Sequence, residues 1–164
     1  MSVEKILVQE SIMPEFLERF KDRASRLKVG DPTKEMDHII GPLINDRQVA
    51  RVKSQIEDAV AKGGNIVLGG KVEGRYVEPT IITDVTSDMT LYRDETFGPV
   101  VSVIPFSTDE EAIAIANDTE YGLSSGVITK DEYRGLEIAQ KLETTPEIIQ
   151  CPSLLIFLLL VLHS

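Results

Sequence analysis

The chain has 164 residues, a length that suits one domain able to bury its own core. Its formal net charge of -10 at pH 7 argues against a nucleic acid partner, since such binding draws most of its affinity from Lys and Arg on phosphates. Hydrophobic residues at 42% and charged residues at 27% are ordinary values for globular proteins and exclude global disorder.

Cysteine usage and the N-terminal segment predict a reducing, cytoplasmic setting. Cys151 is the single cysteine, so an internal disulfide cannot form. The start MSVEKILVQE has neither the basic residues nor the apolar length of a secretion signal. Residues 154–162 form an apolar run, but a membrane span needs about 20 residues, so we expect no membrane association. This run is either a buried strand or core segment, or a sequence foreign to the rest of the fold.

Strands and helices alternate in the first half of the chain. The β-branched run KILVQ at 5–9 predicts a strand, and Ser11 is a candidate cap for a helix over 12–28 with apolar residues every three or four positions. The stretch from Asp31 to Asn45 lacks a clear period and predicts a long ordered loop. A second amphipathic helix follows over 45–62.

The second half continues the same alternation. We expect a strand and turn at 65–70, strands at 80–85, 100–106, 124–129 and 147–150, GRYVEP as a polar connection, a single helical turn at 89–94, and helices at 108–117 and 131–142. Thr108 and Glu111 form a capping box at the start of the third long helix. This order predicts an α/β fold with a mostly parallel sheet flanked by helices.

Few residue clusters point to chemistry. His38 and His163 are far apart in the chain and Cys151 is alone, so we predict no metal site, with both histidines facing solvent and the thiol buried and inert. The acids Asp109, Glu110 and Glu111 fall in the first turn of a helix, where negative charge favours the helix dipole, and are interpreted as structural.

The stretch RDETFGPVVSVIPF places Glu95 and Phe97 at a Gly98-Pro99 corner immediately before a strand. Ligands in open parallel sheets gather at the carboxyl ends of strands, whereas this corner leads into a strand at its amino end. Position alone therefore leaves both a ligand site and a structural turn open.

The motif E-x-F-G-P-V at 95–100 resembles the signature of the NAD(P)-dependent aldehyde dehydrogenase superfamily. The resemblance extends, in the family's order, over about residues 3–144 through KVGDP, GPLI, VEPTI, VSVIPF, IANDTEYGLSSGVIT and KLET. It implies an aldehyde dehydrogenase catalytic-domain-like fold. It also implies that Glu95 accepts hydrogen bonds from the nicotinamide-ribose hydroxyls of NAD or NADP, and that Phe97 packs near the nicotinamide.

The resemblance also implies a reaction whose main groups are not found in this sequence. In the family a cysteine thiolate attacks the aldehyde, and its G-Q-x-C-type segment precedes the strand matched here by KILVQ. We therefore assign no catalytic residue and expect a domain truncated at both ends, with weak or no cofactor binding. After KLET the family's P-F-G-G segment is replaced, and we hypothesise a shifted reading frame, which translating the neighbouring DNA in its other frames would test.

The expected organisation is a partial catalytic domain over 1–150 and an atypical apolar tail over 151–164. The expected function is that of a fragment of an enzyme that oxidises a small-molecule aldehyde to a carboxylic acid, inactive as an isolated chain. The alternatives are a non-catalytic interaction module that forms a homo-oligomer through exposed apolar surface, or one half of a split enzyme.

Overall fold

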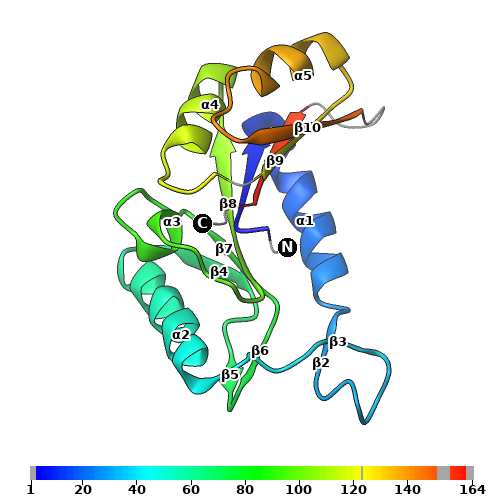
Figure 1. Ribbon diagram of the computed structural model, residues 1–164, viewed down its shortest axis with the longest axis vertical. Coiled ribbons are helices and arrows are strands. Elements are labelled where there is room, and N and C mark those ends of the chain that lie inside the picture. The colour runs from blue at the N-terminus through cyan, green and yellow to red at the C-terminus, as the bar shows by residue number, and fades with distance from the viewer. Residues whose placement is uncertain (1–2, 123, 151–155, 162–164) are drawn as a thin grey trace. The chain divides into compact units, whose positions relative to one another are not determined.

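The computed structural model describes residues 3–122, 124–150 and 156–161. Two compact units make up the chain: residues 1–16 with 103–164 form the first, and residues 17–102 form the second (Figure 1). Helix α1 (Met13–Ala24) and strand β8 (Val100–Phe106) each run from one unit into the other. Strands and helices alternate in both units, as the sequence predicts.

The second unit is built around helix α2 and a short sheet. Its further elements are β2 (Lys28–Val29), β3 (His38–Ile40), α2 (Asp46–Ala61), β4 (Asn65–Leu68), β5 (Val72–Glu73), β6 (Tyr76–Val77), β7 (Thr80–Thr83) and α3 (Thr90–Arg93). Strand β7 pairs in parallel with β8, with Thr80 opposite Val100, and β4 pairs antiparallel with β7. Two small ladders lie outside this sheet, β2 with β3 in parallel and β5 with β6 antiparallel.

The core of the second unit comes from one stripe of α2 and from β7. Val52, Ile56 and Ala59 are buried, in keeping with an amphipathic helix, while Val60 is 48% exposed. Strand β7, Thr-Ile-Ile-Thr, is buried along its whole length, including both threonines. This buried support fixes the turn that leads into β8.

The first unit contains the remaining elements. They are β1 (Lys5–Gln9), the 3₁₀ turn η1 (Glu10–Ile12), α4 (Asp109–Asn117), β9 (Ser124–Thr129), α5 (Glu132–Ala139), β10 (Thr145–Gln150) and β11 (Ile156–Val161). Strand β9 is parallel to β10, and helix α5 packs against both. Strand β11 lies between β9 and β1 and is antiparallel to each.

Helices α4 and α5 begin at side-chain caps, of which the sequence predicts that of α4 at Thr108. Thr108 Oγ1 accepts a hydrogen bond from the Glu111 amide at 3.2 Å, and Asp131 Oδ1 accepts one from the Arg134 amide at 3.1 Å. The Arg134 guanidinium donates to both oxygens of Asp109 at 2.7 and 2.6 Å, which ties the first turn of α4 to α5. Asp109 is therefore a structural residue, as its position in a first helical turn predicts.

Several predicted boundaries are wrong, for local reasons. Ser11 does not cap α1, because it lies inside the 3₁₀ turn that precedes the helix. Helix α1 ends at Ala24 instead of residue 28, because Lys28 and Val29 are taken into the β2–β3 ladder. The same ladder puts a short strand within the predicted loop after Asp31.

Another short ladder falls in the segment GRYVEP, which the sequence suggests is a plain connection. Tyr76 and Val77 pair with β5 to form a hairpin. Two-residue strands carry too little periodicity to be recognised from sequence.

The α/β class is confirmed, because the parallel pairs β7–β8 and β9–β10 are each connected through a helix. Within the apolar tail, residues 156–161 form a strand, whereas 151–155 and 162–164, including Cys151 and His163, lie outside the described residues. Among the helices of the described part, none has both the length and the apolar character needed to cross a membrane.

Asn117 at the end of α4 provides a test of the first unit. Its side-chain Nδ2 donates to the Lys141 carbonyl at 2.9 Å, and its side-chain Oδ1 accepts from the Glu143 backbone amide at 3.0 Å. These two hydrogen bonds join the end of α4 to the segment after α5. Asn117→Ala should lower the free energy of unfolding by about 1–2 kcal/mol, because two backbone groups lose their partner. Asn117→Asp keeps the acceptor, so its free energy of unfolding in urea should lie between those of wild type and Asn117→Ala. Equal free energies of unfolding for all three chains would contradict this role.

Candidate functional site

One face of helix α2 supports the segment from α3 to the Gly98-Pro99 corner. Gln48, Val52, Gln55 and Asp58 are spaced by three or four residues, so they share one side of the helix. Gln48, Gln55 and Asp58 bind residues 96–97, 95 and 90 in turn, and Val52 lies against Gly98. We call these four residues the α2 support face.

Asp58 caps helix α3 from outside that helix. The N-cap residue of α3, Met89, provides no side-chain hydrogen bond, and Asp58 Oδ2 instead accepts from the amide and hydroxyl of Thr90 at 2.7 and 3.0 Å. Lys62 Nζ lies 2.8 Å from Asp58 Oδ1. The hydrogen bond from Lys62, followed by that from the Thr90 amide, holds the pKa of the Asp58 carboxyl below its ordinary value.

Two glutamines hold the backbone of the turn. Gln48 Nε2 donates to the carbonyl oxygens of Thr96 at 2.6 Å and Phe97 at 3.2 Å. Gln55 Nε2 donates to the Glu95 carbonyl at 3.3 Å. Three consecutive carbonyls of the candidate site thus accept hydrogen bonds from one helix.

The corner itself is tightly packed. A Cβ on Gly98 would lie 2.9 Å from Val52 Cγ2, closer than side chains normally approach, and Val52 is fully buried. The carbonyl of Pro99 accepts from the Thr80 amide at 2.8 Å, which joins the corner to β7. Only glycine fits at position 98 without displacement of α2.

Glu95 and Phe97 are presented differently. Phe97 has a φ of 49°, in the left-handed region that is uncommon for a bulky residue, and is 47% exposed. Glu95 is 6% exposed. Phe97 is therefore about half exposed, whereas Glu95 lies at the covered base of the turn.

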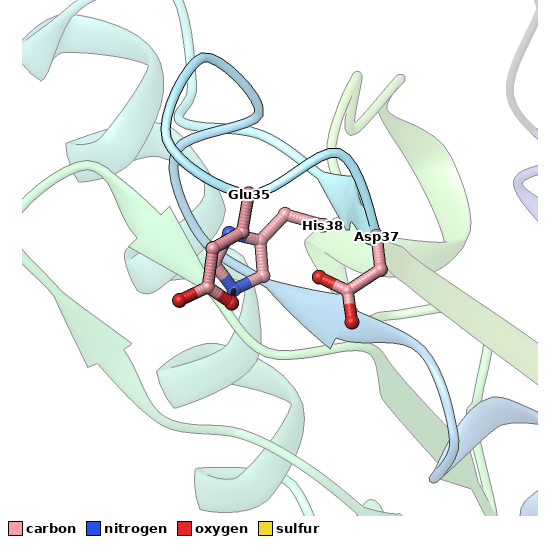
Figure 2. A group of neighbouring side chains, drawn as sticks. All are labelled: Glu35, Asp37 and His38. Carbon is pink, nitrogen blue, oxygen red and sulfur yellow. Dashed lines mark ion pairs between the residues drawn. The ribbon is translucent and has the colours of Figure 1, made fainter.

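A second group of polar residues lies on the loop after β2 and at the start of β3. Glu35, Asp37 and His38 each place one potential metal-ligand atom within 4.8 Å of the others (Figure 2). Glu35 and Asp37 are exposed, and the Asp37 carboxylate already pairs with Lys28 Nζ. That hydrogen bond lowers the pKa of Asp37 and raises the pKa of Lys28, so a bound cation would have to displace the ammonium. We assign no metal to this group.

His38 does not face solvent as the sequence suggests. Its side chain is 20% exposed and pairs with Glu35 at 3.6 Å. The imidazole lies against Gly30, where an added Cβ would be 2.5 Å from His38 Cε1. The ring fills the space that a residue without a side chain leaves in the β2–β3 loop, which sequence separation alone does not predict.

The chain is similar over most of its length to known aldehyde dehydrogenases. The aldehyde dehydrogenase family matches residues 1–152. Salicylaldehyde dehydrogenase of Pseudomonas putida is 41% identical over 143 residues, covering 87% of this chain and 30% of that protein. The crystal structure of lactaldehyde dehydrogenase from Escherichia coli superposes with a TM-score of 0.85 at 36% identity, covering 90% of this chain and 32% of that one.

A third relative has been solved with a nucleotide. Betaine aldehyde dehydrogenase from Staphylococcus aureus in complex with NAD+ gives a TM-score of 0.83 at 36% identity, covering 89% of this chain and 30% of that one. The chain therefore belongs to the aldehyde dehydrogenase family. It spans about 30% of the length of the relatives that it matches.

The carboxylate of Asp58 makes stability depend on pH. Because its folded-state pKa is lowered, its contribution is present above the unfolded pKa of about 3.9 and is lost as the pH falls through the folded value. In urea unfolding below pH 4, wild type should lose more stability per pH unit than Asp58→Asn. Parallel pH profiles for the two chains would contradict the cap.

The contact between Gly98 and Val52 can be tested by a double-mutant cycle. Gly98→Ala should lower the free energy of unfolding by about 1–3 kcal/mol, because the new methyl group overlaps a buried side chain. In a Val52→Ala background the same change should cost less, with a coupling of at least about 0.5 kcal/mol. Strictly additive effects would show that the two residues do not touch.

Proposed function

We propose that this chain forms part of the catalytic domain of an NAD(P)-dependent aldehyde dehydrogenase and contributes Glu95 and Phe97 to the nicotinamide side of the cofactor site. The observation that carries the proposal is the segment 95–100, E-x-F-G-P-V, held as a rigid corner in a chain of this family. In such an enzyme the cofactor supplies the hydride acceptor, and the residues of this chain bind and orient it.

Phe97 is suited to packing against a flat ring. Its side chain is about half exposed, and its left-handed backbone is supported by the hydrogen bond from Gln48 to its carbonyl. A fixed aromatic surface loses little conformational entropy when a nicotinamide stacks on it.

Glu95 offers the acceptor that a ribose diol requires, since an ionised carboxylate has two oxygens and accepts from two hydroxyls. At 6% exposure, however, its side chain has to move toward the surface before it can accept them. The free energy of that movement is subtracted from binding, so the isolated chain should hold the cofactor very weakly.

The chain alone should not turn over an aldehyde. Its only cysteine, Cys151, lies far along the sequence from the position that matches the family's nucleophile, ahead of KILVQ. Loss of a covalent nucleophile typically removes several powers of ten in rate. The relatives named above act on salicylaldehyde, lactaldehyde and betaine aldehyde, so the substrate class we propose is an aldehyde without a more specific choice.

The domain organisation and surroundings of the chain form part of the same proposal. The family match ends at residue 152, which supports a distinct tail after the catalytic-domain segment. Strand β11 in that tail is paired on both edges, with β1 and with β9, so its backbone is not free to recruit another chain. This pairing disfavours the interaction-module alternative. A cytoplasmic setting and homo-oligomer formation stay predictions.

An NMR titration with NAD+ tests the proposed function. Signals of residues 95–98 should shift with an affinity in the millimolar range, and Phe97→Ala should weaken that affinity at least about threefold, since most of the ring contact is lost. Tyr133→Ala is the matched control, because Tyr133 is 85% exposed and lies on α5. No shift at the turn, or micromolar binding, would contradict the proposal, as would aldehyde oxidation by the pure chain.

A further inference from the structure

Gln48 makes side-chain hydrogen bonds that its position at the start of a helix does not predict. It is the third residue of α2, and its backbone amide donates to the Asn45 side chain at 2.8 Å, which is an ordinary N-cap. In a capping box the side chain at this position reaches back to the N-cap amide. Here the Gln48 side chain turns away from its own helix and donates to Thr96 and Phe97 instead.

The hydrogen bonds of Gln48 offset the energetic cost of the strained backbone at Phe97. A left-handed φ at a non-glycine residue costs about 1–2 kcal/mol, and Phe97 has no glycine-like freedom to offset it. Gln48 Nε2 donates to the carbonyls on either side of the Phe97 Cα, and so favours the conformation that keeps both oxygens within its reach. The pair at 2.6 and 3.2 Å therefore selects the turn in which the Phe97 ring points outward.

Gln55 makes a weaker hydrogen bond to the start of the turn, at Glu95. Its bond to the Glu95 carbonyl is 3.3 Å long, and within the described residues its Oε1 atom is buried without a hydrogen-bond partner. A side chain with one long bond and one unsatisfied acceptor contributes little net stability. The two glutamines thus differ in strength, although they donate to neighbouring carbonyls from the same helix face.

We infer that Gln48 is a positioning residue for the cofactor site: by donating to the carbonyls of Thr96 and Phe97, it holds Phe97 in the left-handed conformation that presents its ring. The inference rests on the proposed function for its consequence in cofactor binding. Its structural part, the hold on the turn, is measurable without any cofactor.

Two substitutions separate this role from an effect on helix α2. Gln48→Glu has the same shape and improves the helix N-terminus, where a negative charge is favoured, but it removes the donors. Gln48→Lys keeps N–H donors and is slightly unfavourable at that end of a helix. If Gln48 acts only through the stability of helix α2, Gln48→Glu should be the more stable variant. If it acts through the turn, Gln48→Lys should be the variant in which residues 94–100 are more stable.

Hydrogen exchange of the peptide over residues 94–100 is the direct readout. In Gln48→Glu its exchange should be about tenfold faster than in wild type, equivalent to about 1.4 kcal/mol of lost local stability. Gln48→Lys should stay within about threefold of wild type. Lys53→Gln, on the exposed surface of α2, changes the net charge by the same amount as Gln48→Glu and should leave the exchange unchanged.

Binding of NAD+ to the same chains completes the test. The affinity should fall at least about threefold in Gln48→Glu and be retained in Gln48→Lys. Unchanged exchange at residues 94–100 in Gln48→Glu would overturn the inference, whatever happens to binding. If exchange responds as expected but wild type shows no NAD+ shifts, the proposed function fails, whereas the hold of Gln48 on the turn stands.

Discussion

The candidate site depends on the hydrogen bonds and packing between one face of helix α2 and the chain from α3 to the Gly98-Pro99 corner. Asp58 caps α3, Gln55 and Gln48 bind three successive carbonyls, and Val52 leaves room only for glycine at position 98. Each contact is modest, at about 1 kcal/mol, but together they fix a turn with a left-handed phenylalanine. The sheet contributes through β7, which binds the carbonyl of Pro99.

This arrangement explains why an acid and an aromatic ring occur at the entrance to a buried strand. The carbonyls of residues 95–97 and Pro99 accept hydrogen bonds, while Phe97 remains about half exposed and β8 continues into the sheet. Glu95 stays covered at its base, and its carboxylate is reached only at a cost. The chain spans about 30% of its relatives' length, and the proposed cofactor site would need further residues for its full affinity.

Much of the fold is predictable from sequence because periodicity and capping are local. The strand KILVQ, the buried positions of α2, and the caps Thr108 and Asp131 follow from residues within one or two turns of each other. The support of the turn is different, because Gln48 and Thr96 are 48 positions apart and a glutamine at the third position of a helix resembles ordinary capping. The motif at 95–100 identifies the turn, but the burial of Glu95 and the donors that hold its neighbours are set by tertiary packing.

The most direct test of this account is an NMR measurement on the Gln48 side-chain amide in the wild-type chain. The account predicts scalar coupling across the hydrogen bond between Gln48 Nε2 and the Thr96 carbonyl carbon, together with nuclear Overhauser contacts from the amide protons to the backbone of Phe97. A Gln48 amide with the averaged shifts of a solvent-exposed side chain, and no contact to residues 96–97, would contradict the claim that helix α2 holds the turn.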